Sequence, residues 1–397
     1  MLATRKVDRQ NDTSHAGKSM RRTITPAVLN MAAAPTAMRT PSTAELGRRD
    51  CVFMPTNRDY GVDVPPSIDS IALLDLPPFK PRFPWWTADL QTIAVLLGTY
   101  TPDLAPHTSE RVCFCMADRS GDILVGMLDR PAEPQHGRPL VILVHGLTGC
   151  ENSSHILNAA RHLLGRGYRV LRLNLRGCGA SRPYCREHYH IGRTADFRRV
   201  LWQLPDDLTD NGIVVVGYSM GGAMLLKYLG EEGSFSPLRA AAAICAPIDL
   251  MRTCQHMMRP RNWIYHLYIL NGLRKEALAQ SAKMTEEERE IVRNTKSVLE
   301  YDERFIAPRY GFRGAEDYYE LCTPIEYMPE IRVPTLVLAA GDDPWIPVEY
   351  YRDFKWSDNR WLMPVITEGG GHLGFHCAST EQPWCDLALE RFLDRIC

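Results

Sequence analysis

A serine flanked by glycines stands directly behind a short apolar run. Residues 213–216 are β-branched, as in a buried parallel strand, and they lead into Gly217-Tyr218-Ser219-Met220-Gly221. Residues 223–228 predict a helix that Gly230 ends. Glycines on both sides of the serine would let strand and helix approach across a tight turn. The order of strand, turn, serine and helix predicts a nucleophile elbow, with the helix N-terminus favouring negative charge beside the serine oxygen.

A serine hydroxyl becomes a useful nucleophile when a base removes its proton and a third group orients that base. Downstream of Ser219 the chain has four histidines, and one of them, His372, follows a glycine run just behind the last expected strand. A flexible loop there could bring the imidazole over the end of the sheet, so we predict His372 as the base. The other three are His256, His266 and His376.

The acid that orients the histidine should leave the strand expected at residues 335–340. Asp342 and Asp343 follow that strand directly, and successive side chains at a strand end point in opposite directions, so one of the two should reach the histidine. Pro344 biases the backbone of Asp343 toward an extended conformation. We therefore predict Asp343 as the acid and Asp342 as a cap of the turn. Asp249, at the end of an earlier strand, is the alternative acid.

Two backbone N–H groups are expected to stabilise the oxyanion that forms when a nucleophile attacks a carbonyl group. The N–H of Met220 adjoins the serine. The second should come from the loop after the first parallel strand, His145-Gly146-Leu147-Thr148-Gly149, and we predict the N–H of Leu147. His145 precedes the nucleophile in the chain, so we expect it to shape this loop. Such chemistry uses neither a cofactor nor a metal ion, and the sequence predicts neither.

The segments that must position these residues alternate between strand and helix. This alternation predicts an α/β fold, a mostly parallel sheet covered by helices on both faces. Two further strands, at residues 112–116 and 123–128, flank Ser120-Gly121-Asp122 and predict an antiparallel hairpin at one edge. The alternating strands are expected at residues 140–144, 168–175, 213–216, 238–245, 335–340 and 362–366, and the helices at 156–164, 196–204 and 385–396.

One interval, between Asp249 and Val333, has helical patterns and no strand pattern. Thr285-Glu286-Glu287-Glu288 is a capping box that starts one helix, and residues 263–273 predict a more apolar one. Helices inserted before the penultimate strand would lie over the strand ends, where ligands bind. We therefore predict a helical cap at about residues 250–332, with packing away from the site as the alternative.

Composition narrows the class of protein. The 397 residues are 45% hydrophobic and 23% charged, as is usual for a globular protein. The net charge is −1, so the chain lacks the overall positive charge that would indicate nucleic acid as a partner. No apolar run approaches the roughly 18 residues of a membrane-spanning helix, which leaves peripheral membrane contact open. Twelve cysteines without a Cys-x-x-Cys pair indicate reduced thiols in an intracellular, cytoplasmic protein rather than disulfides or a metal site.

Residues 1–64 are predicted to form a basic, disordered N-terminal arm, and residues 65–397 the folded domain. The first fifty residues hold nine Lys or Arg, four acidic residues and no sustained apolar periodicity, so they cannot bury a core. We expect them to be removable without loss of activity. Organelle transit peptides share this Arg-rich, acid-poor composition, so organelle targeting is the alternative role of the arm.

Several segments between about residue 80 and the C-terminus resemble, in the same order, the YheT-like branch of the α/β-hydrolase superfamily with its eukaryotic lipid-esterase relatives. The resemblance implies the α/β-hydrolase fold, the triad Ser219, Asp343 and His372, and carboxylester or lipid-ester substrates. The matching segments are Leu90-Gln91-Thr92, His145-Gly146-Leu147-Thr148-Gly149, Arg176-Gly177-Cys178, Gly217-Tyr218-Ser219-Met220-Gly221-Gly222, Asp342-Asp343-Pro344 and Gly370-Gly371-His372-Leu373-Gly374-Phe375.

The leading hypothesis is a serine hydrolase that cleaves carboxylic esters of the acyl or lipid type through an acyl-enzyme. Acyl transfer to an alcohol with the same triad is the first alternative, and a non-catalytic binding protein is the second. Epoxide hydrolase and dehalogenase chemistry is disfavoured because those relatives place a carboxylate where this chain has Ser219. The expected partner is a small ester with a hydrocarbon acyl chain. We predict that the pocket for this chain is lined by part of the apolar and aromatic surface formed by Trp263, Ile264, Tyr265, Tyr268 and Ile269.

Overall fold

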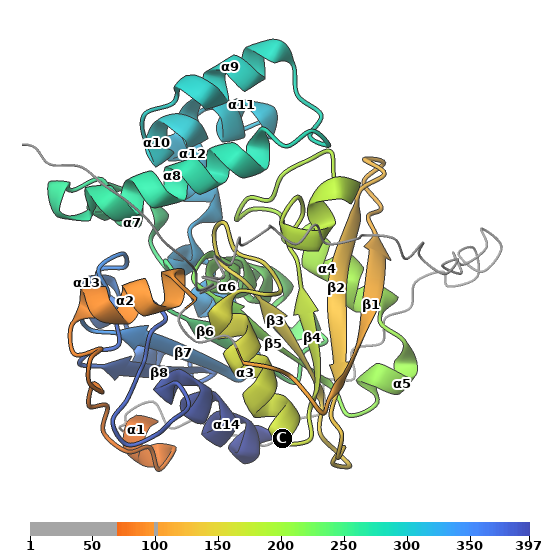
Figure 1. Cartoon of the computed structure of the whole chain (residues 1–397), viewed down its shortest axis with the longest axis vertical. Coiled ribbons are helices and arrows are strands. Elements are labelled where there is room, and N and C mark those ends of the chain that lie inside the picture. The colour runs from red at the N-terminus through yellow and green to blue at the C-terminus, as the bar shows by residue number, and fades with distance from the viewer. Residues whose placement is uncertain (1–69, 99–101) are drawn as a thin grey trace, which may run out of the picture. The chain divides into compact units, whose positions relative to one another are not determined.

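In this computed structural model, which describes residues 70–98 and 102–397, eight strands form one sheet (Figure 1). Their order is β1-β2-β4-β3-β5-β6-β7-β8. The pairs β1–β2 and β2–β4 are antiparallel and the other pairs are parallel, so the predicted edge hairpin and mostly parallel sheet are confirmed. The strands are β1 (Thr108–Cys115), β2 (Ile123–Arg130), β3 (Leu140–Val144), β4 (Arg169–Leu173), β5 (Ile213–Tyr218), β6 (Ala240–Ile244), β7 (Thr335–Ala340) and β8 (Leu362–Thr367).

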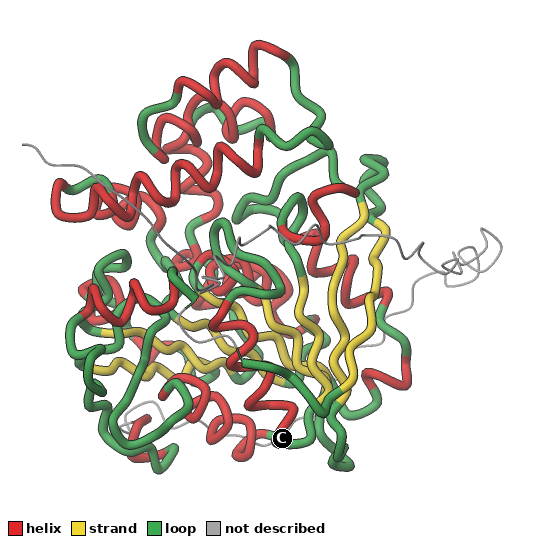
Figure 2. Tube along the Cα trace, in the orientation of Figure 1, coloured by secondary structure: helices red, strands yellow, loops and turns green. Residues whose placement is uncertain are grey.

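Helices cover both faces of the sheet (Figure 2). Alternate side chains of β3 enter opposite layers: Ile142 and Val144 pack with α4 and α6, and Val141 and Leu143 pack with α3 and α14. Because both faces are covered, β3, β5, β6 and β7 are buried along their whole length, which explains their continuous apolar runs. These helices are α3 (Ser154–Gly165), α4 (Ala195–Gln203), α6 (Met220–Glu232) and α14 (Trp384–Ile396).

The helix behind the candidate nucleophile is longer than predicted. α6 continues through Gly230 to Glu232, and Gly233, with a φ of 53°, follows its end. A Cβ atom on Gly230 would lie 2.2 Å from the carbonyl oxygen of Tyr327. The prediction that Gly230 ends the helix was therefore wrong, because this glycine allows a later segment to pack closely against the helix.

The interval between β6 and β7 consists of helices and connecting loops. Figure 1 shows α8 to α12 above the upper ends of the strands. The predicted capping box forms at the start of α9: Glu288 N–H donates to Thr285 Oγ1, 3.1 Å away, and Thr285 N–H donates to the Glu288 carboxylate, 2.8 Å away. The α-helices are α7 (Leu250–Met257), α8 (Trp263–Ala277), α9 (Glu286–Asn294), α10 (Val298–Tyr301), α11 (Ala307–Arg309) and α12 (Ala315–Cys322).

The predictions for residues 1–64 lie outside the described residues. All of the described residues belong to the compact unit Pro55–Cys397. Within them, no helix combines the length and the apolar character that crossing a membrane requires. The cysteines in this part of the chain are free thiols.

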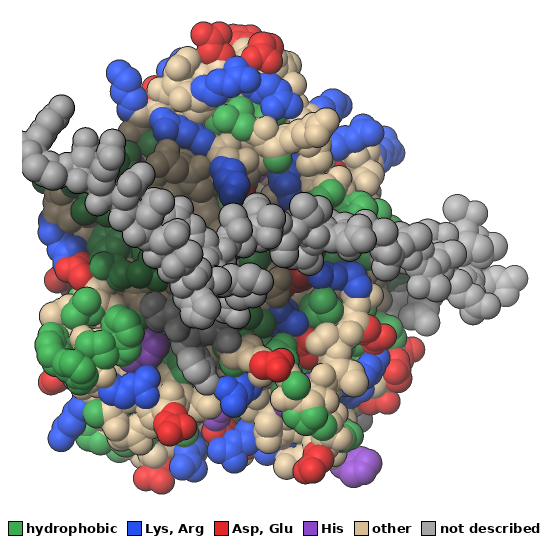
Figure 3. Space-filling model, in the orientation of Figure 1, with side chains coloured by type: hydrophobic (Ala, Val, Ile, Leu, Met, Phe, Trp, Pro, Cys, Tyr) green, Lys and Arg blue, Asp and Glu red, His purple; other side chains and the backbone are tan. Residues whose placement is uncertain are grey.

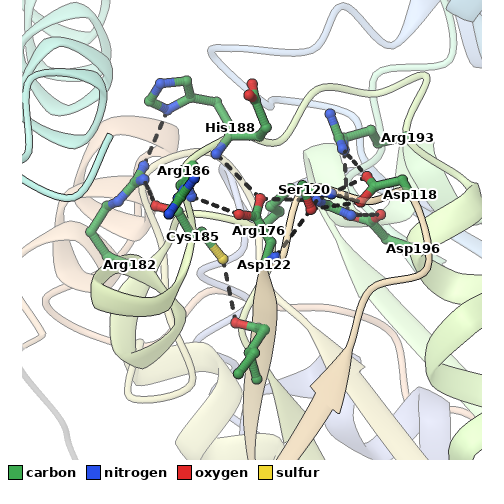
Figure 4. A network of polar contacts seen from close by, with 12 residues as sticks. Asp118, Ser120, Asp122, Arg176, Arg182, Cys185, Arg186, His188, Arg193 and Asp196 are labelled. Atoms are coloured by element: carbon green, nitrogen blue, oxygen red, sulfur yellow. Dashed lines mark hydrogen bonds and ion pairs between the residues drawn. The ribbon is translucent and has the colours of Figure 1, made fainter. Parts of the chain in front are cut away.

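A buried arginine network fixes the loop that follows β4 (Figure 4). The Arg176 guanidinium lies 3.0 Å from the carboxylate of Asp118, 2.9 Å from that of Asp122 and 2.6 Å from that of Asp196. These acids come from the turn between β1 and β2 and from α4. The network therefore connects the β1–β2 turn, the loop after β4 and helix α4. It positions this loop, which continues to Arg193 and borders the site described below.

Arg176→Met should destabilise the fold strongly. Removing the cation leaves the buried carboxylate of Asp122 without an ion-pair partner among the described residues and that of Asp196 with only Arg193, 3.6 Å away, and breaking such a buried pair costs about 3–5 kcal/mol. Urea unfolding measures the loss. Arg198→Met is the matched control, because Arg198 forms exposed ion pairs with Glu231 and Glu232, which contribute about 1 kcal/mol or less. Equal losses in the two variants would contradict a structural role for the buried network.

Candidate active site

Ser219 occupies a sharp turn between β5 and α6. Its backbone has a φ of 51° and a ψ of −122°, which only a tightly packed turn maintains in a non-glycine residue. A Cβ atom on Gly217 would lie 2.4 Å from the Gly221 carbonyl oxygen, and one on Gly221 would lie 2.5 Å from the His145 carbonyl oxygen. Both flanking glycines are therefore required for the approach of strand, helix and neighbouring loop. The strand, turn and helix follow one another as predicted, and the turn places the serine at the N-terminus of α6.

Three of the predicted residues meet in a chain of hydrogen bonds. Ser219 Oγ lies 3.0 Å from His372 Nε2, and His372 Nδ1 lies 2.8 Å from Asp343 Oδ2. All three side chains are buried. An ionised carboxylate only accepts hydrogen bonds, so Nδ1 carries the imidazole hydrogen and Nε2 offers its lone pair to the serine hydroxyl. This arrangement can remove a proton from Ser219.

The three candidate acids have different hydrogen-bond partners in the structure. Asp343 contacts His372 through one oxygen, and its other oxygen accepts from the N–H groups of Trp345 at 2.8 Å and Ile346 at 3.1 Å. Asp342 Oδ1 instead accepts from the Gly371 N–H at 2.8 Å, so this carboxylate holds the glycine loop. Burial raises the pKa of Asp342 above its ordinary value. Asp249 is the N-cap of α7, where it accepts from the Arg252 N–H.

Two residues that the sequence analysis missed hold His372 in place. The Trp345 ring stacks on the imidazole with ring centroids 4.3 Å apart. The backbone N–H of His372 donates to Thr92 Oγ1, 2.9 Å away on helix α2 (Ala88–Leu96). Thr92 belongs to the segment Leu90-Gln91-Thr92, which resembles the YheT-like branch, but the resemblance assigned no role to this residue. No sequence pattern pointed to Trp345 apart from its position next to Pro344.

The side chain of Gln91, next to Thr92, holds the loop that follows His372 through the backbone of His376. Its Oε1 accepts from the His376 N–H at 2.7 Å, and its Nε2 donates to the His376 carbonyl oxygen at 3.0 Å. Gly371 has a φ of 57°, and a Cβ atom there would lie 2.5 Å from the Ala88 carbonyl oxygen. The start of α2 therefore fixes the conformation of the glycine loop, although it lies far away in the sequence.

The loop after β3 lies against the serine. A Cβ atom on Gly146 would be 2.9 Å from Ser219 Cβ, and Leu147, Ser219 and Met220 all border one cavity. Met220 is the first residue of α6, where backbone N–H groups have no acceptor within the helix. The N–H groups of Leu147 and Met220 thus belong to the two segments that adjoin the serine.

The His145 side chain holds this loop through two hydrogen bonds. Its Nε2 accepts from the Leu175 N–H at 3.1 Å, and its Nδ1–H donates to the Gly146 carbonyl oxygen at 2.8 Å. Burial lowers the pKa of His145 to about 4, so the ring is neutral at physiological pH. These contacts agree with the predicted structural role. The loop is also held from the other side, where the Thr148 N–H donates to the Tyr189 hydroxyl at 3.1 Å.

A cavity of about 120 Å³ adjoins Ser219 and extends between the sheet and the helical insertion. Part of the apolar surface of residues 263–269 was predicted to line such a cavity, and Ile269 does so. Trp263 and Ile264 are instead 57% and 70% exposed, and the Tyr265 hydroxyl donates to Asp89 on α2. The aliphatic and methionine side chains along the cavity are Leu147, Ile191, Met220, Leu250, Met257, Ile269, Leu273, Val298, Ile306 and Ile346.

The outer side of α8 belongs to an exposed apolar surface. Figure 3 shows hydrophobic side chains grouped on the left of the molecule, where Figure 1 places α2 and the start of α8. Trp86 and Leu97, next to α2, are exposed like Trp263. Apolar side chains thus lie on both sides of α8, which is why the residues facing the cavity could not be identified from the helical pattern alone.

Two carboxyl groups also border the cavity. Glu276 accepts from the Tyr189 hydroxyl at 2.9 Å, and Asp302 accepts from the Tyr319 hydroxyl at 2.6 Å. Burial raises the pKa of each carboxyl group to about 7. Both groups therefore change protonation near neutral pH, unlike an exposed carboxyl group.

Glu276→Gln should flatten the pH dependence of stability. A carboxyl group whose pKa is raised by folding holds its proton more tightly in the folded state. Its stabilising contribution is complete below the unfolded pKa, about 4.3, and is lost as the pH rises through the folded pKa of about 7. The wild-type free energy of unfolding should therefore fall more steeply across this range than that of the variant. Urea titrations at several pH values test this, with the exposed Glu287→Gln as control; parallel profiles for wild type and Glu276→Gln would refute it.

One group of residues in the described part of the chain has the side-chain types of a metal site. Ligand atoms of Cys245, Asp343 and His372 lie within 4.8 Å of one another. Burial raises the pKa of the Cys245 thiol well above its ordinary value, which favours the neutral thiol over the thiolate that binds metals. A cation here would also have to replace the hydrogen bond between His372 and Asp343. The arrangement therefore suits the hydrogen-bonded pair better than a metal ion.

Comparisons with known proteins agree with this architecture. The family model of the alpha/beta hydrolase fold matches residues 139–377. Mouse phospholipase ABHD3 is 31% identical over 60% of this chain and 58% of its own length. The putative esterase YheT of Escherichia coli is 30% identical over 62% of this chain and 73% of its own length. Among solved structures, Pyrococcus furiosus esterase Pf2001 superposes with a TM-score of 0.50 at 18% identity, over 75% of this chain and 96% of that protein.

Two consequences follow from these matches. The predicted resemblance to the YheT-like branch is confirmed by the similarity to YheT itself. The chain spans less than two thirds of the length of the mouse relative.

Proposed function

The chain belongs to the alpha/beta hydrolase family, and from this premise we propose that it hydrolyses carboxylic esters through an acyl-enzyme formed on Ser219. The observation that carries the proposal is the buried hydrogen-bond chain from Ser219 Oγ through His372 to Asp343, which opens onto a largely apolar cavity. The named activities of the mouse and bacterial relatives, phospholipase and putative esterase, support the same class of reaction.

In the first half-reaction, Ser219 Oγ attacks the ester carbonyl carbon while His372 Nε2 takes the hydroxyl proton. Asp343 accepts the hydrogen bond from Nδ1 and stabilises the imidazolium. The N–H groups of Leu147 and Met220 donate to the oxyanion. As the tetrahedral intermediate collapses, the bond to the alcohol oxygen breaks and His372 returns the proton to that oxygen, which leaves an acyl group on Ser219.

In the second half-reaction, water attacks the acyl carbonyl carbon. His372 Nε2 takes a proton from the water, and the same two N–H groups donate to the new oxyanion. Collapse breaks the bond to Ser219 Oγ, and His372 returns the proton to the serine. An alcohol could replace the water in this step, which would make the same site an acyltransferase.

We assign residues 250–332 the role of a cap on a hydrolase domain at residues 65–397. The support is that α7, α8, α10 and α12 all contribute side chains to the cavity beside Ser219. These helices would supply most of the apolar wall that holds the acyl chain. Contact with a lipid surface stays a prediction, for which the exposed Trp86, Leu97 and Trp263 offer apolar side chains.

Hydrolysis should depend on acyl length. The cavity of about 120 Å³ is close in size to an engineered cavity of about 150 Å³ that holds benzene, a molecule of six carbons. We therefore expect space for an acyl chain of about six carbons. Each buried methylene contributes up to about 0.8 kcal/mol, or about fourfold in kcat/KM. With p-nitrophenyl esters from acetate upward, kcat/KM should rise to about hexanoate and then level off.

A flat length profile would contradict the role of the cavity as an acyl site. The same assays, run with added ethanol, separate the two fates of the acyl-enzyme. The proposed hydrolase releases mainly the free acid, whereas an ethyl ester as the main product at low ethanol would identify an acyltransferase. Absence of turnover on every ester would support a binding protein instead.

A further inference from the structure

Two buried histidines with unpartnered nitrogen atoms border the cavity beside Ser219. His188 and His190 lie in the loop that the Arg176 network positions. His188 Nε2 and His190 Nδ1 are buried and form no hydrogen bond with any described residue. Such groups are uncommon in folded proteins, because a buried polar atom without a partner is costly. The residues that border the cavity thus have hydrogen-bonding capacity that the chain itself does not use.

The contact with Arg182 identifies the hydrogen on His188. Arg182 Nη1 lies 3.2 Å from His188 Nδ1 (Figure 4). A guanidinium group only donates, so Nδ1 must accept and Nε2 must carry the hydrogen. Burial, together with the positive charge of Arg182, lowers the pKa of His188 to about 3, so the ring is neutral. His188 Nε2–H is therefore a hydrogen-bond donor that lacks an acceptor.

Acceptors for a second hydrogen bond border the same cavity. The carboxyl groups of Glu276 and Asp302 each hold one tyrosine hydroxyl and have further lone pairs. The rest of the wall is mainly aliphatic and aromatic, with Leu250, Met257 and Leu273 among its members. A purely hydrocarbon chain would fill this space and leave the donor of His188 unpaired. A chain with one polar substituent would satisfy it.

We propose that the cavity recognises a substrate chain that bears a hydroxyl group, whose oxygen accepts from His188 Nε2–H. The hydroxyl hydrogen is donated to the carboxyl group of Glu276 or Asp302. This inference rests on the proposed function, since it specifies the chain attached to the ester that Ser219 attacks. The hydroxyl group belongs either to the acyl part or to the alcohol part of that ester, and both sources share this chemistry.

The test compares matched esters on the full-length protein. In the acyl arm, the p-nitrophenyl esters of 3-hydroxyhexanoate and 6-hydroxyhexanoate are compared with that of hexanoate. In the alcohol arm, the monoacetate of 1,6-hexanediol is compared with hexyl acetate. Each pair gives a preference ratio, the kcat/KM of the hydroxylated ester divided by that of its parent. For wild type, we expect a ratio of one or more in one arm, although a hydroxyl group disfavours transfer into an apolar cavity.

Variants of His188 assign the preference to its Nε2. His188→Leu should lower the ratio about tenfold or more, because the hydroxyl group loses its donor. His188→Gln should keep the ratio, since the glutamine amide nitrogen reaches the position of Nε2. His188→Asn is the matched control: it introduces the same amide group, but its nitrogen reaches only the position of Nδ1, so the ratio should fall as in His188→Leu.

The outcomes separate this inference from the proposed function. Hydrolysis of the parent esters with ratios far below one in both arms would overturn the inference and leave the ester hydrolase standing. So would a wild-type preference that all three His188 variants retain. Absence of hydrolysis of every ester, parents included, would overturn both. Circular dichroism and p-nitrophenyl acetate turnover establish that each variant is folded, and the wild-type ratios alone decide the question if a variant does not fold.

Discussion

Ser219→Ala should abolish ester hydrolysis and labelling by a fluorophosphonate probe while the protein remains folded. The substitution removes the only atom of this side chain that contacts His372 Nε2, and it adds no bulk to the turn. Loss of the serine in a comparable triad lowers kcat by about six powers of ten. The measurement combines kcat on p-nitrophenyl hexanoate with probe labelling and a thermal unfolding curve.

The control for this variant is Ser357→Ala, a change of the same type at an exposed position that does not line the cavity. Ser357→Ala should hydrolyse the ester and react with the probe like wild type. Activity of Ser219→Ala within a few-fold of wild type would remove Ser219 from the mechanism. Retained hydrolysis with lost labelling would show that the probe and the substrate use different groups.

Asp343→Asn should lower kcat by about four powers of ten, as does loss of the orienting acid in other triads. The amide that replaces Oδ2 donates to His372 Nδ1, so the imidazole hydrogen moves to Nε2 and the lone pair that would accept the serine proton is lost. Asp342→Asn keeps an acceptor for the Gly371 N–H, so its kcat should change by less than about tenfold. Steady-state kinetics of the two variants, with unfolding curves, measure the difference.

The two neighbouring aspartates are each other's control, because both changes remove one carboxylate from the same turn. A larger loss in Asp342→Asn would move the orienting role to Asp342. Equal, small losses would mean that neither carboxylate orients the histidine during turnover. In that case the hydrogen bond between His372 and Asp343 would have a structural role alone.

Local patterns carried most of the information about the sheet and about the three residues in the hydrogen-bond chain. Buried parallel strands have continuous apolar runs, so β3 and β7 were predicted with their observed bounds. The serine, the histidine and the acid each follow such a strand at its carboxyl end, where side chains from neighbouring strands converge. Their contact could thus be expected from the sequence, while their catalytic roles remain proposals.

Contacts between distant segments could not be predicted in this way. Thr92 accepts from the N–H of His372, although the two residues are far apart in the chain. The packing of Tyr327 against Gly230, which turned an expected helix end into a helix interior, is a contact of the same kind. Neither has a periodic signal, because each depends on how separate elements pack.

The cavity wall was the least predictable part of the candidate site. Helix α8 has apolar residues on opposite sides, so periodicity could not decide which side faces the cavity. The structure places Ile269 and Leu273 there and leaves Trp263 and Ile264 exposed. His188, Glu276 and Asp302 come from three different segments, and the sequence analysis gave none of them a role.

The central claim is that an acyl group passes through Ser219. Its most direct test is mass spectrometry of the protein quenched in acid within milliseconds after mixing with p-nitrophenyl hexanoate, followed by peptide mapping. We predict one hexanoyl group per protein on the peptide that contains Ser219, formed together with a burst of p-nitrophenol, and no such group in Ser219→Ala. A burst of p-nitrophenol with the hexanoyl group on another residue, or with no acylated peptide, would contradict the account.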